Sequence, residues 1–411
     1  MFCKNPLRSS KRWYRGAVSL VLLLAGCGGG GGGGTAGAPG SGLPADYGYS
    51  VPVAKGDGWN VAEAAGLGMS VELLEDMINA VQDREYPIVD SIAIAYQGKL
   101  VLDETLRTSL HESDGWVGNR DPAMHAQFSV SKSFVSILIG IAIEQGIIPG
   151  VESPYLALFD YPDYQNWDDR KNDITVEDVL TMRLGLEWNE WDPPYFDPDN
   201  QLLKFYENEF DYSKGLLDLP MAANPGERFA YNTVASVSLG QAIENSGPLT
   251  LTDFGTTYLA APLQITALEV RRTPTGLPDL GGGVYLSTRD ALKIGQLYAD
   301  DGIWNGQRIV SSEWVAVSTQ PHVTLTWTEP DAWAWKLDGY GYQWWSGYFD
   351  YDGHRLASFA ARGYGQQVVM VIPELELVVA VNAHGYDDAE GEQNQVFSLI
   401  ARFILPAIPR P

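Results

Sequence analysis

The stretch HAQFSVSKSF, from His125 to Phe134, places a lysine three residues after a serine at the start of a long apolar segment. Side chains three positions apart on a helix share one face, so a helix that begins near Ser129 brings its hydroxyl within reach of the Lys132 amine. The segment that follows, FVSILIGIAI, is apolar nearly all round and predicts a helix buried on most sides that ends near Gly146. The spacing therefore predicts a serine and a lysine that meet at the start of a buried helix.

A serine and a lysine in this arrangement can perform nucleophilic catalysis. A serine hydroxyl is a weak nucleophile and needs a neighbouring base. Lys132 can be that base only as a neutral amine, which requires burial or adjacent positive charge to lower its pKa. The helix start also offers unpaired N–H groups that stabilise negative charge on an attacked carbonyl oxygen. The alternative is a capped helix with Lys132 in water, and one Ser-x-x-Lys in the sequence does not decide between the two.

Two further segments favour the catalytic interpretation. The sequence FAYNT places Tyr231, with Thr233 two residues later, immediately before another predicted helix, where a phenol and a hydroxyl can project into a shared cleft. The sequence FAARGYG places Ala361, Arg362 and Gly363 on or beside a predicted strand. Each segment has a structural alternative, because a core tyrosine before a helix and a surface arginine on a strand are both common.

With these residues the chain resembles the penicillin-recognising serine hydrolases: class C-like β-lactamases, D-alanyl-D-alanine carboxypeptidases, and related esterases and 6-aminohexanoate-dimer hydrolases. The resemblance extends from about Gly58 to Leu405 and includes ITVEDVLTMRLGLEW and GLPDLGGGVYLSTRD. It implies that Ser129 is the acylated nucleophile and Lys132 a general base. It also implies that Tyr231 transfers protons between the serine, the leaving group and later the attacking water.

Two positions depart from the pattern of true β-lactamases. Thr233 stands where those enzymes have an asparagine, although a hydroxyl there is similar to the esterase and amidase branches. The Lys-Thr-Gly of β-lactamases is replaced by Ala-Arg-Gly ending at Gly363, and the missing lysine, which helps to hold the substrate carboxylate, argues against efficient penicillin hydrolysis. Arg362 either offers a displaced cation or lies on the surface. The resemblance places the oxyanion donors at the backbone N–H groups of Ser129 and Tyr364.

The order of the predicted elements favours an α+β fold with one antiparallel sheet built from both chain ends and flanked by helices. The resemblance implies that this is the β-lactamase/transpeptidase-like fold. A hairpin is predicted around Gly98, and a late hairpin that turns near Pro373 should lie beside it. The sheet region then comprises residues 58–145 and 270–411, with a mainly helical region inserted at 146–269. Further helices are predicted at Ser70 to Gln82 and at Glu392 to Phe403.

The N-terminal part of the chain has the composition of an export signal followed by a linker. Basic residues precede the run AVSLVLLLAG, which is shorter than the roughly eighteen apolar residues of a spanning helix. The sequence LAGC resembles the lipobox of bacterial lipoproteins, which implies a signal peptide at 1–26 and a lipid on Cys27. Residues 27–57 begin with a glycine run and predict a flexible tether. Gly28 favours outer-membrane anchoring, periplasm-facing or on the surface, and the alternative is a secreted protein cut near Ala36 to Ala38.

The composition of the chain limits the binding partners and cofactors that can be expected. The net charge of -25 argues against nucleic acid and anionic lipid surfaces, so membrane attachment must rest on the lipid anchor. The two cysteines, Cys3 and Cys27, leave no disulfide for the body of the chain. The histidines lack metal spacing, and no metal or other cofactor is expected. The aromatic residues Trp188, Trp191 and the segment YGYQWW belong either to the core or to an acyl or sugar-like subsite.

The predicted function is a serine hydrolase that cleaves an ester or amide bond of a small molecule or peptide through an acyl-enzyme on Ser129. A D-Ala-D-Ala carboxypeptidase or a weak β-lactamase is the alternative within the same chemistry. A lipoprotein without catalysis, which keeps the fold to bind envelope polymers or another protein, is the alternative of a different class. The sequence leaves the oligomeric state open.

Overall fold

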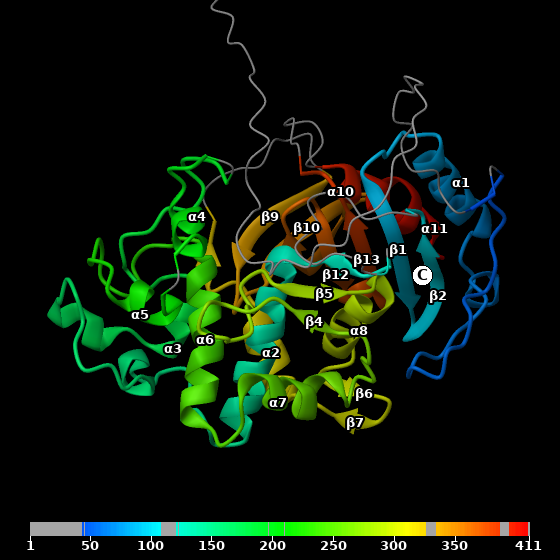
Figure 1. Ribbon diagram of the computed structural model, residues 1–411. Helices are drawn as coiled ribbons and strands as arrows, with labels where there is room; N and C mark the ends of the chain where they lie inside the picture. The colour runs from blue at the N-terminus through cyan, green and yellow to red at the C-terminus, as the bar shows by residue number, and fades with distance from the viewer. Residues whose placement is uncertain are drawn as a thin grey trace, which may run out of the picture. The chain divides into compact units, whose positions relative to one another are not determined.

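The structure, a computed structural model, describes residues 43–44, 46–107, 121, 123–195, 197–208, 210–325, 334–386 and 394–409 (Figure 1). The predicted signal peptide, Cys27 and the first part of the predicted tether lie outside these ranges. Among the residues that are described, no helix combines the length and the apolar character that crossing a membrane requires.

A large antiparallel sheet carries the fold, with the strand order β2-β1-β13-β12-β11-β10-β9-β8. The first hairpin pairs with the last strand, Ile92 lying opposite Val381, so the sheet is assembled from both ends of the chain. This confirms the predicted fold class and the predicted neighbourhood of the two hairpins. The strands are β1 (Val89–Tyr96), β2 (Lys99–Thr105), β8 (Val323–Thr324), β9 (Trp335–Tyr340), β10 (Trp345–Tyr351), β11 (His354–Gly363), β12 (Gln367–Ile372) and β13 (Leu377–Ala383).

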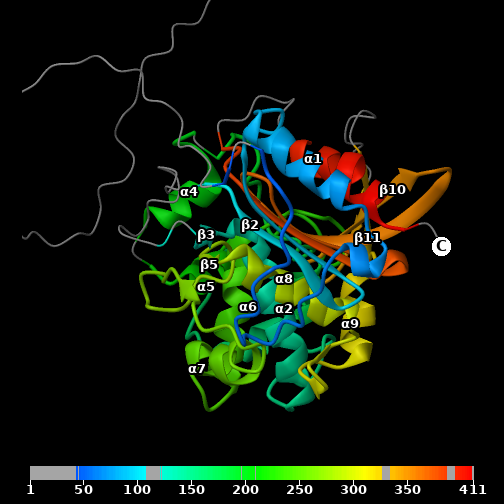
Figure 2. The ribbon, with the colours of Figure 1, turned by 90° about the vertical axis from the view of Figure 1, so that its right-hand side faces the viewer.

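Helices cover both faces of this sheet (Figure 2). On one face α1 packs against the C-terminal helices, and on the other α8 lies across β1, β12 and β13. Gly295 lets α8 approach closely, because a Cβ there would lie 2.5 Å from a methyl carbon of Val378. The α1 helix begins as predicted, with the Ser70 hydroxyl accepting from the N–H of Leu73 at 3.3 Å. The elements are α1 (Val71–Gln82), α8 (Thr288–Ala299), α10 (Gln395–Leu399), η8 (Ile400–Ile404) and α11 (Leu405–Ala407).

The predicted helical region is observed between the two parts of the sheet. Its central helix, α6, packs against α2, which also contacts β11 and so joins the helices to the sheet. The α2 helix is buried along most of its length, as its all-round apolar sequence predicts. The elements are α2 (Ser131–Glu144), η4 (Tyr155–Leu158), η5 (Asp169–Asp173), α3 (Val176–Leu180), α4 (Gln201–Tyr206), α5 (Tyr212–Leu217), α6 (Thr233–Ser246), α7 (Leu251–Gly255) and η6 (Thr256–Ala260).

Shorter elements connect these parts. A small sheet with the order β3-β5-β4 lies where the chain enters α2. The elements are η1 (Ala65–Leu67), β3 (His125–Ala126), η3 (Phe128–Val130), β4 (Glu269–Val270), β5 (Val284–Leu286), β6 (Ile303–Trp304), β7 (Gln307–Arg308), α9 (Ser312–Thr319) and η7 (Pro373–Leu375).

The last part of the predicted tether packs against the sheet region. Tyr47 is buried, and its hydroxyl donates to Glu104 at 2.7 Å. The hydroxyl of Tyr49 donates to the carbonyl of Val101 at 3.0 Å. Packed residues therefore begin well before Gly58, where composition alone placed the start of the folded body.

Candidate active site

Ser129 lies in the 3-10 turn η3, between the short strand β3 and the buried helix α2. The residue before it, Phe128, has a φ of 45°, a left-handed conformation that costs a side-chain-bearing residue about 1–2 kcal/mol. Such conformations persist where the surrounding structure enforces them, and they cluster at functional sites. The turn leaves Ser129 half-buried at the start of α2, as its position before the apolar run predicted.

Lys132 is directed at this serine and is closed off from water, with only 1% of its surface exposed. Its Nζ lies 2.9 Å from Ser129 Oγ, 3.0 Å from Thr233 Oγ1 and 2.6 Å from the carbonyl oxygen of Gly281. Burial lowers the pKa of Lys132 to about 8, although the carboxylates of Glu190 and Asp279 oppose the change. The alternative of a lysine in solvent is therefore wrong, and the amine is available as a base near neutral pH.

Glu190 is a site residue that the sequence did not single out. Its carboxylate is 1% exposed and accepts from the N–H of Thr233 at 2.6 Å and from the Thr233 hydroxyl at 2.8 Å. The indole N–H of Trp188 and the hydroxyl of Tyr195 donate to the same carboxylate at 3.1 and 2.9 Å. In the sequence, only its position between the two tryptophans of LEWNEW distinguishes Glu190 from other acidic residues. That is a weak indication of a site residue in a chain with 52 acidic residues.

The carbonyl of Gly281 is held in place by its own loop. Asp279 is buried and accepts from the N–H groups of Gly281 and Gly282 at 3.0 and 3.1 Å, while it forms an ion pair with Arg271. A Cβ on Gly281 would lie 2.5 Å from the carbonyl oxygen of Thr233, so only glycine allows this loop to approach α6 so closely. The acceptor that Gly281 presents to the amine is therefore rigidly placed.

Tyr231 also lies at the serine, as the resemblance implies. Its ring is stacked between Trp191 and Trp345, with centroid distances of 5.3 and 5.5 Å, and the Lys132 Nζ lies 5.0 Å from its centroid. Burial and the Glu190 carboxylate raise the pKa of Tyr231 well above its ordinary range, against the opposing effect of a hydrogen bond with Ser129. At neutral pH the phenol is therefore protonated, and Lys132 is the stronger candidate for the base.

The end of β11 lies against the turn that carries the serine. A Cβ on Gly363 would lie 2.3 Å from the carbonyl oxygen of Gln127, so a side chain at this position would force the strand away from η3. The next residue, Tyr364, places its ring 5.8 Å from that of Phe128, in an edge-on contact. Tyr364 therefore follows directly on the close contact between β11 and the turn that carries Ser129, and its oxyanion role stays a prediction.

Arg362 is neither a free surface residue nor a copy of the β-lactamase lysine. It is half-buried on β11, with its guanidinium 5.5 Å from the ring centroid of Trp335, 5.6 Å from that of Trp345 and 5.1 Å from that of Phe397. Its positive charge lowers the pKa of Tyr231, which places it within electrostatic reach of the phenol. The displaced cation that the sequence allowed is therefore close to the site.

The two tryptophans of LEWNEW have different positions. Trp188 is buried against Phe205 and supports Glu190 through its indole N–H. Trp191 keeps 44% of its surface exposed and covers one face of Tyr231. The structure therefore assigns Trp188 to the core and Trp191 to the wall of the site.

A model of the family described as Beta-lactamase matches residues 81–398, well over half of the chain. The chain belongs to the β-lactamase family. The 6-aminohexanoate-dimer hydrolase of Paenarthrobacter ureafaciens is 25% identical to it over 263 residues, which cover 59% of this chain and 61% of that relative. The chain thus spans less than two thirds of the relative's length.

Solved structures share the fold. The octameric penicillin-binding protein homologue from Pyrococcus abyssi superposes with a TM-score of 0.58 at 17% identity, covering 80% of this chain and 76% of its own. EstCE1, a hydrolase with promiscuous acyltransferase activity, superposes with a TM-score of 0.60 at 15% identity, covering 82% and 99%. The family match confirms the predicted family, and these superpositions confirm the predicted fold.

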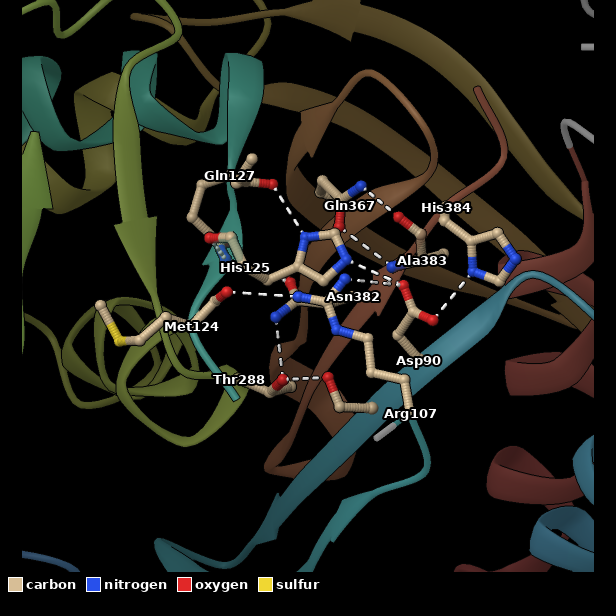
Figure 3. A network of polar contacts seen from close by, with 12 residues as sticks. Asp90, Arg107, Met124, His125, Gln127, Thr288, Gln367, Asn382, Ala383 and His384 are labelled. Carbon is tan, nitrogen blue, oxygen red and sulfur yellow. Dashed lines mark hydrogen bonds and ion pairs between the residues drawn. The ribbon is translucent and has the colours of Figure 1, made fainter. Parts of the chain in front are cut away.

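Figure 3 shows a network of ion pairs and hydrogen bonds around Asp90 in this β-lactamase-family chain. Asp90 on β1 accepts from the ring nitrogens of His125 and His384 at 2.9 and 2.8 Å, and Arg107 lies 3.5 Å from the same carboxylate. Burial alone would raise the pKa of Asp90, but the two histidines outweigh it and hold that pKa well below its usual range. Because His125 is in β3, the network secures the strand that leads into Ser129.

Buried amides extend this network to both sides of the site (Figure 3). The Gln127 side chain donates to the Asn382 side chain at 3.2 Å, which in turn donates to Thr288 at 2.9 Å. The Gln367 side chain donates to the carbonyl of Tyr364 at 3.1 Å and accepts from the N–H of Ala383 at 3.0 Å. The serine turn and the end of β11 are therefore tied to the same central strand, β13.

Replacing Asp90 by asparagine is expected to lower the free energy of unfolding by about 3 kcal/mol, because an amide would leave buried cationic groups without their charge partner. Since the folded pKa of Asp90 is depressed, its stabilisation is present above pH ~4 and is lost as the pH falls below that value. Urea unfolding at neutral pH measures the loss. Asp199→Asn, which removes an exposed ion pair with Lys204, is the control and should change stability little.

Side chains and the backbone carbonyl of Gly281 together build the site in the described part of the chain. No group of three or more histidine, cysteine, aspartate or glutamate residues among the described residues is arranged to hold a metal ion. Of the residues predicted from sequence, Ser129, Lys132, Tyr231, Thr233 and the end of β11 are brought together. Cys27 lies outside the described ranges.

Proposed function

We propose that this member of the β-lactamase family hydrolyses an ester or amide bond through an acyl-enzyme on Ser129. The observation that carries the proposal is the Lys132 Nζ, 2.9 Å from Ser129 Oγ and buried, with a pKa lowered to about 8. A base of this pKa next to a hydroxyl is what activation of a serine nucleophile requires. Only groups of the protein are needed for the reaction.

Acylation begins with proton transfer from the Ser129 hydroxyl to the neutral Lys132 amine while Oγ bonds to the substrate carbonyl carbon. The carbonyl oxygen becomes negatively charged, and the N–H groups of Ser129 and Tyr364 stabilise it. The bond to the leaving alcohol or amine then breaks. The departing group receives a proton from the Tyr231 phenol, which recovers one from the Lys132 ammonium.

Deacylation uses the same residues in the reverse direction. A water molecule attacks the acyl carbon, and its proton passes to Tyr231 and Lys132 as the oxyanion forms again. The bond to Ser129 Oγ then breaks, and the serine recovers its proton from Lys132, which returns to the neutral amine. Burial keeps the Tyr231 phenol protonated at neutral pH. In both half-reactions Tyr231 therefore passes a proton on, whereas Lys132 holds the proton between the two steps of each half-reaction.

The surroundings of Ser129 favour a substrate with an apolar or aromatic part. Phe128, Tyr195 and Tyr386 gather around the ring of Tyr364, and Trp191 extends the wall beyond Tyr231. No lysine replaces the one that holds the penicillin carboxylate in β-lactamases. We propose a linear ester or amide in preference to a β-lactam, with support from the similarity to a 6-aminohexanoate-dimer hydrolase and to EstCE1, a hydrolase with promiscuous acyltransferase activity.

Export and lipid attachment at Cys27, with the folded body facing the periplasm or the cell surface, remain part of the proposal. Their support is the charge pattern and the LAGC sequence of the N-terminus. The acyl chains would have to provide the attachment, because the acidic body does not favour an anionic membrane.

The test is covalent labelling of the protein with a fluorophosphonate, followed by intact-mass measurement and peptide mapping. One adduct on Ser129 supports the proposal, and an unlabelled folded protein favours the non-catalytic binding alternative. Peptide mapping is needed because Ser131 and Ser133 lie in the same segment. Steady-state assays with nitrophenyl esters, nitrocefin and a D-Ala-D-Ala peptide then rank the ester, β-lactam and peptide reactions, and the ester is expected to be hydrolysed fastest.

The rate of ester hydrolysis should rise with pH through about 8 and then level off, because only the neutral form of Lys132 accepts the serine proton. Well below that pH, each unit should change kcat/KM about tenfold. Initial rates between pH ~6 and ~10, corrected with Ser129→Ala as the blank, give the profile. A profile that stays flat across this range would contradict a lysine base.

Replacing Trp191 by alanine should raise KM for an aromatic ester roughly five- to tenfold, the effect of losing one ring contact in the substrate-facing wall. The change in kcat should be smaller, since the hydrogen bonds of Lys132 do not involve the indole. Trp167→Ala is the matched control, because Trp167 is also exposed, at 50%, but its indole N–H donates to Asp169 outside the site. Equal kinetics for the two variants would remove Trp191 from the substrate wall.

A further inference from the structure

The Thr233 hydroxyl lies between the amine of Lys132 and the carboxylate of Glu190. Its oxygen is 3.0 Å from the Lys132 Nζ and 2.8 Å from Glu190 Oε1. A hydroxyl has one hydrogen, and a carboxylate can only accept. The hydrogen of Thr233 is therefore committed to Glu190, and the oxygen can only accept from Lys132.

The other fixed contact of Lys132 is an acceptor as well. The carbonyl oxygen of Gly281, 2.6 Å from Nζ, has no hydrogen to give. A neutral amine carries two N–H groups and one lone pair. Since Thr233 and Gly281 take both N–H groups, the lone pair is left for the third neighbour, Ser129 Oγ, at 2.9 Å.

We infer that Glu190 is a positioning residue that, through the Thr233 hydroxyl, aims the lone pair of Lys132 at the nucleophile. The inference rests on the proposed function, because it describes how the base of that reaction is oriented. Without the carboxylate, the Thr233 hydrogen could turn toward Nζ and compete with Ser129 for the lone pair. Glu190 is buried, and it acts on Lys132 through the hydroxyl of Thr233.

The same arrangement accommodates the base after it has taken the proton. The ammonium has three N–H groups, and Thr233, Gly281 and Ser129 provide three acceptors at hydrogen-bond distance. Proton transfer therefore needs no rotation of Lys132, which fits a preorganised site. The backbone N–H of Thr233 donates to Glu190 Oε2 at 2.6 Å. This second hydrogen bond holds the carboxylate so that Oε1 accepts from the Thr233 hydroxyl.

Three variants test the inference through kcat, KM and the pH profile of ester hydrolysis. Glu190→Gln should lower the plateau of kcat about tenfold or more and leave KM within about twofold. It should also move the acid limb of the profile to lower pH, because the negative charge that raises the Lys132 pKa is gone. Thr233→Val should lower kcat similarly by removing the hydroxyl, and Thr233→Ser should restore it.

Glu187→Gln is the matched control, because Glu187 is an exposed carboxylate three residues away in the same segment. It should leave kcat, KM and the acid limb unchanged. Folding of each variant is checked by its thermal unfolding midpoint. If Glu190→Gln does not fold, the comparison of Thr233→Val with Thr233→Ser decides, since valine keeps the shape of threonine without its hydroxyl and serine keeps the hydroxyl.

The outcomes separate this inference from the proposed function. If the wild-type protein reacts with a fluorophosphonate at Ser129 and hydrolyses the ester, while Glu190→Gln keeps both its plateau and its acid limb, the orienting role is wrong and the serine mechanism stands. If the folded wild-type protein shows neither labelling nor hydrolysis, the proposed function itself is wrong. A lower plateau with an unmoved acid limb would also count against the inference, because a merely structural defect produces that result.

Discussion

Replacing Ser129 by alanine is expected to lower kcat for a nitrophenyl ester on the order of 10⁴-fold or more, since no other group can form the acyl-enzyme. The methyl group fits the half-buried position of the serine, so KM and the unfolding midpoint should change little. Progress curves at enzyme concentrations high enough to measure the residual rate give kcat. The labelled peptide should disappear from the fluorophosphonate map of the same variant.

The matched control is Ser133→Ala, the same substitution one turn further along α2. The Ser133 hydroxyl is buried and donates to the carbonyl of Gln343 at 2.9 Å, away from the amine of Lys132. Its loss should cost stability about 1 kcal/mol while leaving kcat nearly unchanged. If Ser129→Ala and Ser133→Ala retained equal activity, the acyl-enzyme would have to be abandoned.

Replacing Gly363 by alanine is expected to lower kcat about 10²- to 10³-fold, the usual cost of losing an oxyanion donor. The added Cβ would lie 2.3 Å from the carbonyl oxygen of Gln127, which is backbone and cannot turn away. The end of β11 must therefore shift and carry the N–H of Tyr364 away from the developing oxyanion. Steady-state kinetics with the ester measure the loss, which should fall on kcat more than on KM.

Gly150→Ala provides the control for this prediction. A Cβ at Gly150 would meet no heavy atom within 4 Å, so the same added methyl group has open space there. Activity and unfolding midpoint should both match the wild type. Should Gly363→Ala also retain full activity, the close approach of β11 to the serine turn would have no part in catalysis.

Much of the fold could be predicted because its signals are local. The Gly98 turn, the Ser70 cap and the apolar run behind Lys132 each specify an element through neighbouring residues, and all three are observed. The pairing of β1 with β13 followed from strand signals at both chain ends together with the family resemblance. Ser129 and Lys132 were found for the same reason, since one helical turn joins them.

The parts of the site that were missed depend on contacts between distant segments. In the sequence Glu190 is one acidic residue among many. Its importance follows from the fold, which places its carboxylate in hydrogen-bond contact with the Thr233 hydroxyl. The spacing of the histidines does not fit a metal site, and it does not predict their actual role. His125 and His384 come from distant parts of the chain and both form hydrogen bonds with Asp90. The spacing of residues along the sequence does not predict contacts between such distant segments.

The position of β13 has a consequence for how the protein is made. This strand is synthesised after β1 and β12 but fits between them, and every residue of β1 and β12 is buried in the finished sheet. Until β13 arrives, both neighbours present unpaired hydrophobic edges, which are templates for aggregation. A nascent chain that lacks residues 377–383 cannot complete its sheet, so the sheet can close only after β13 has emerged.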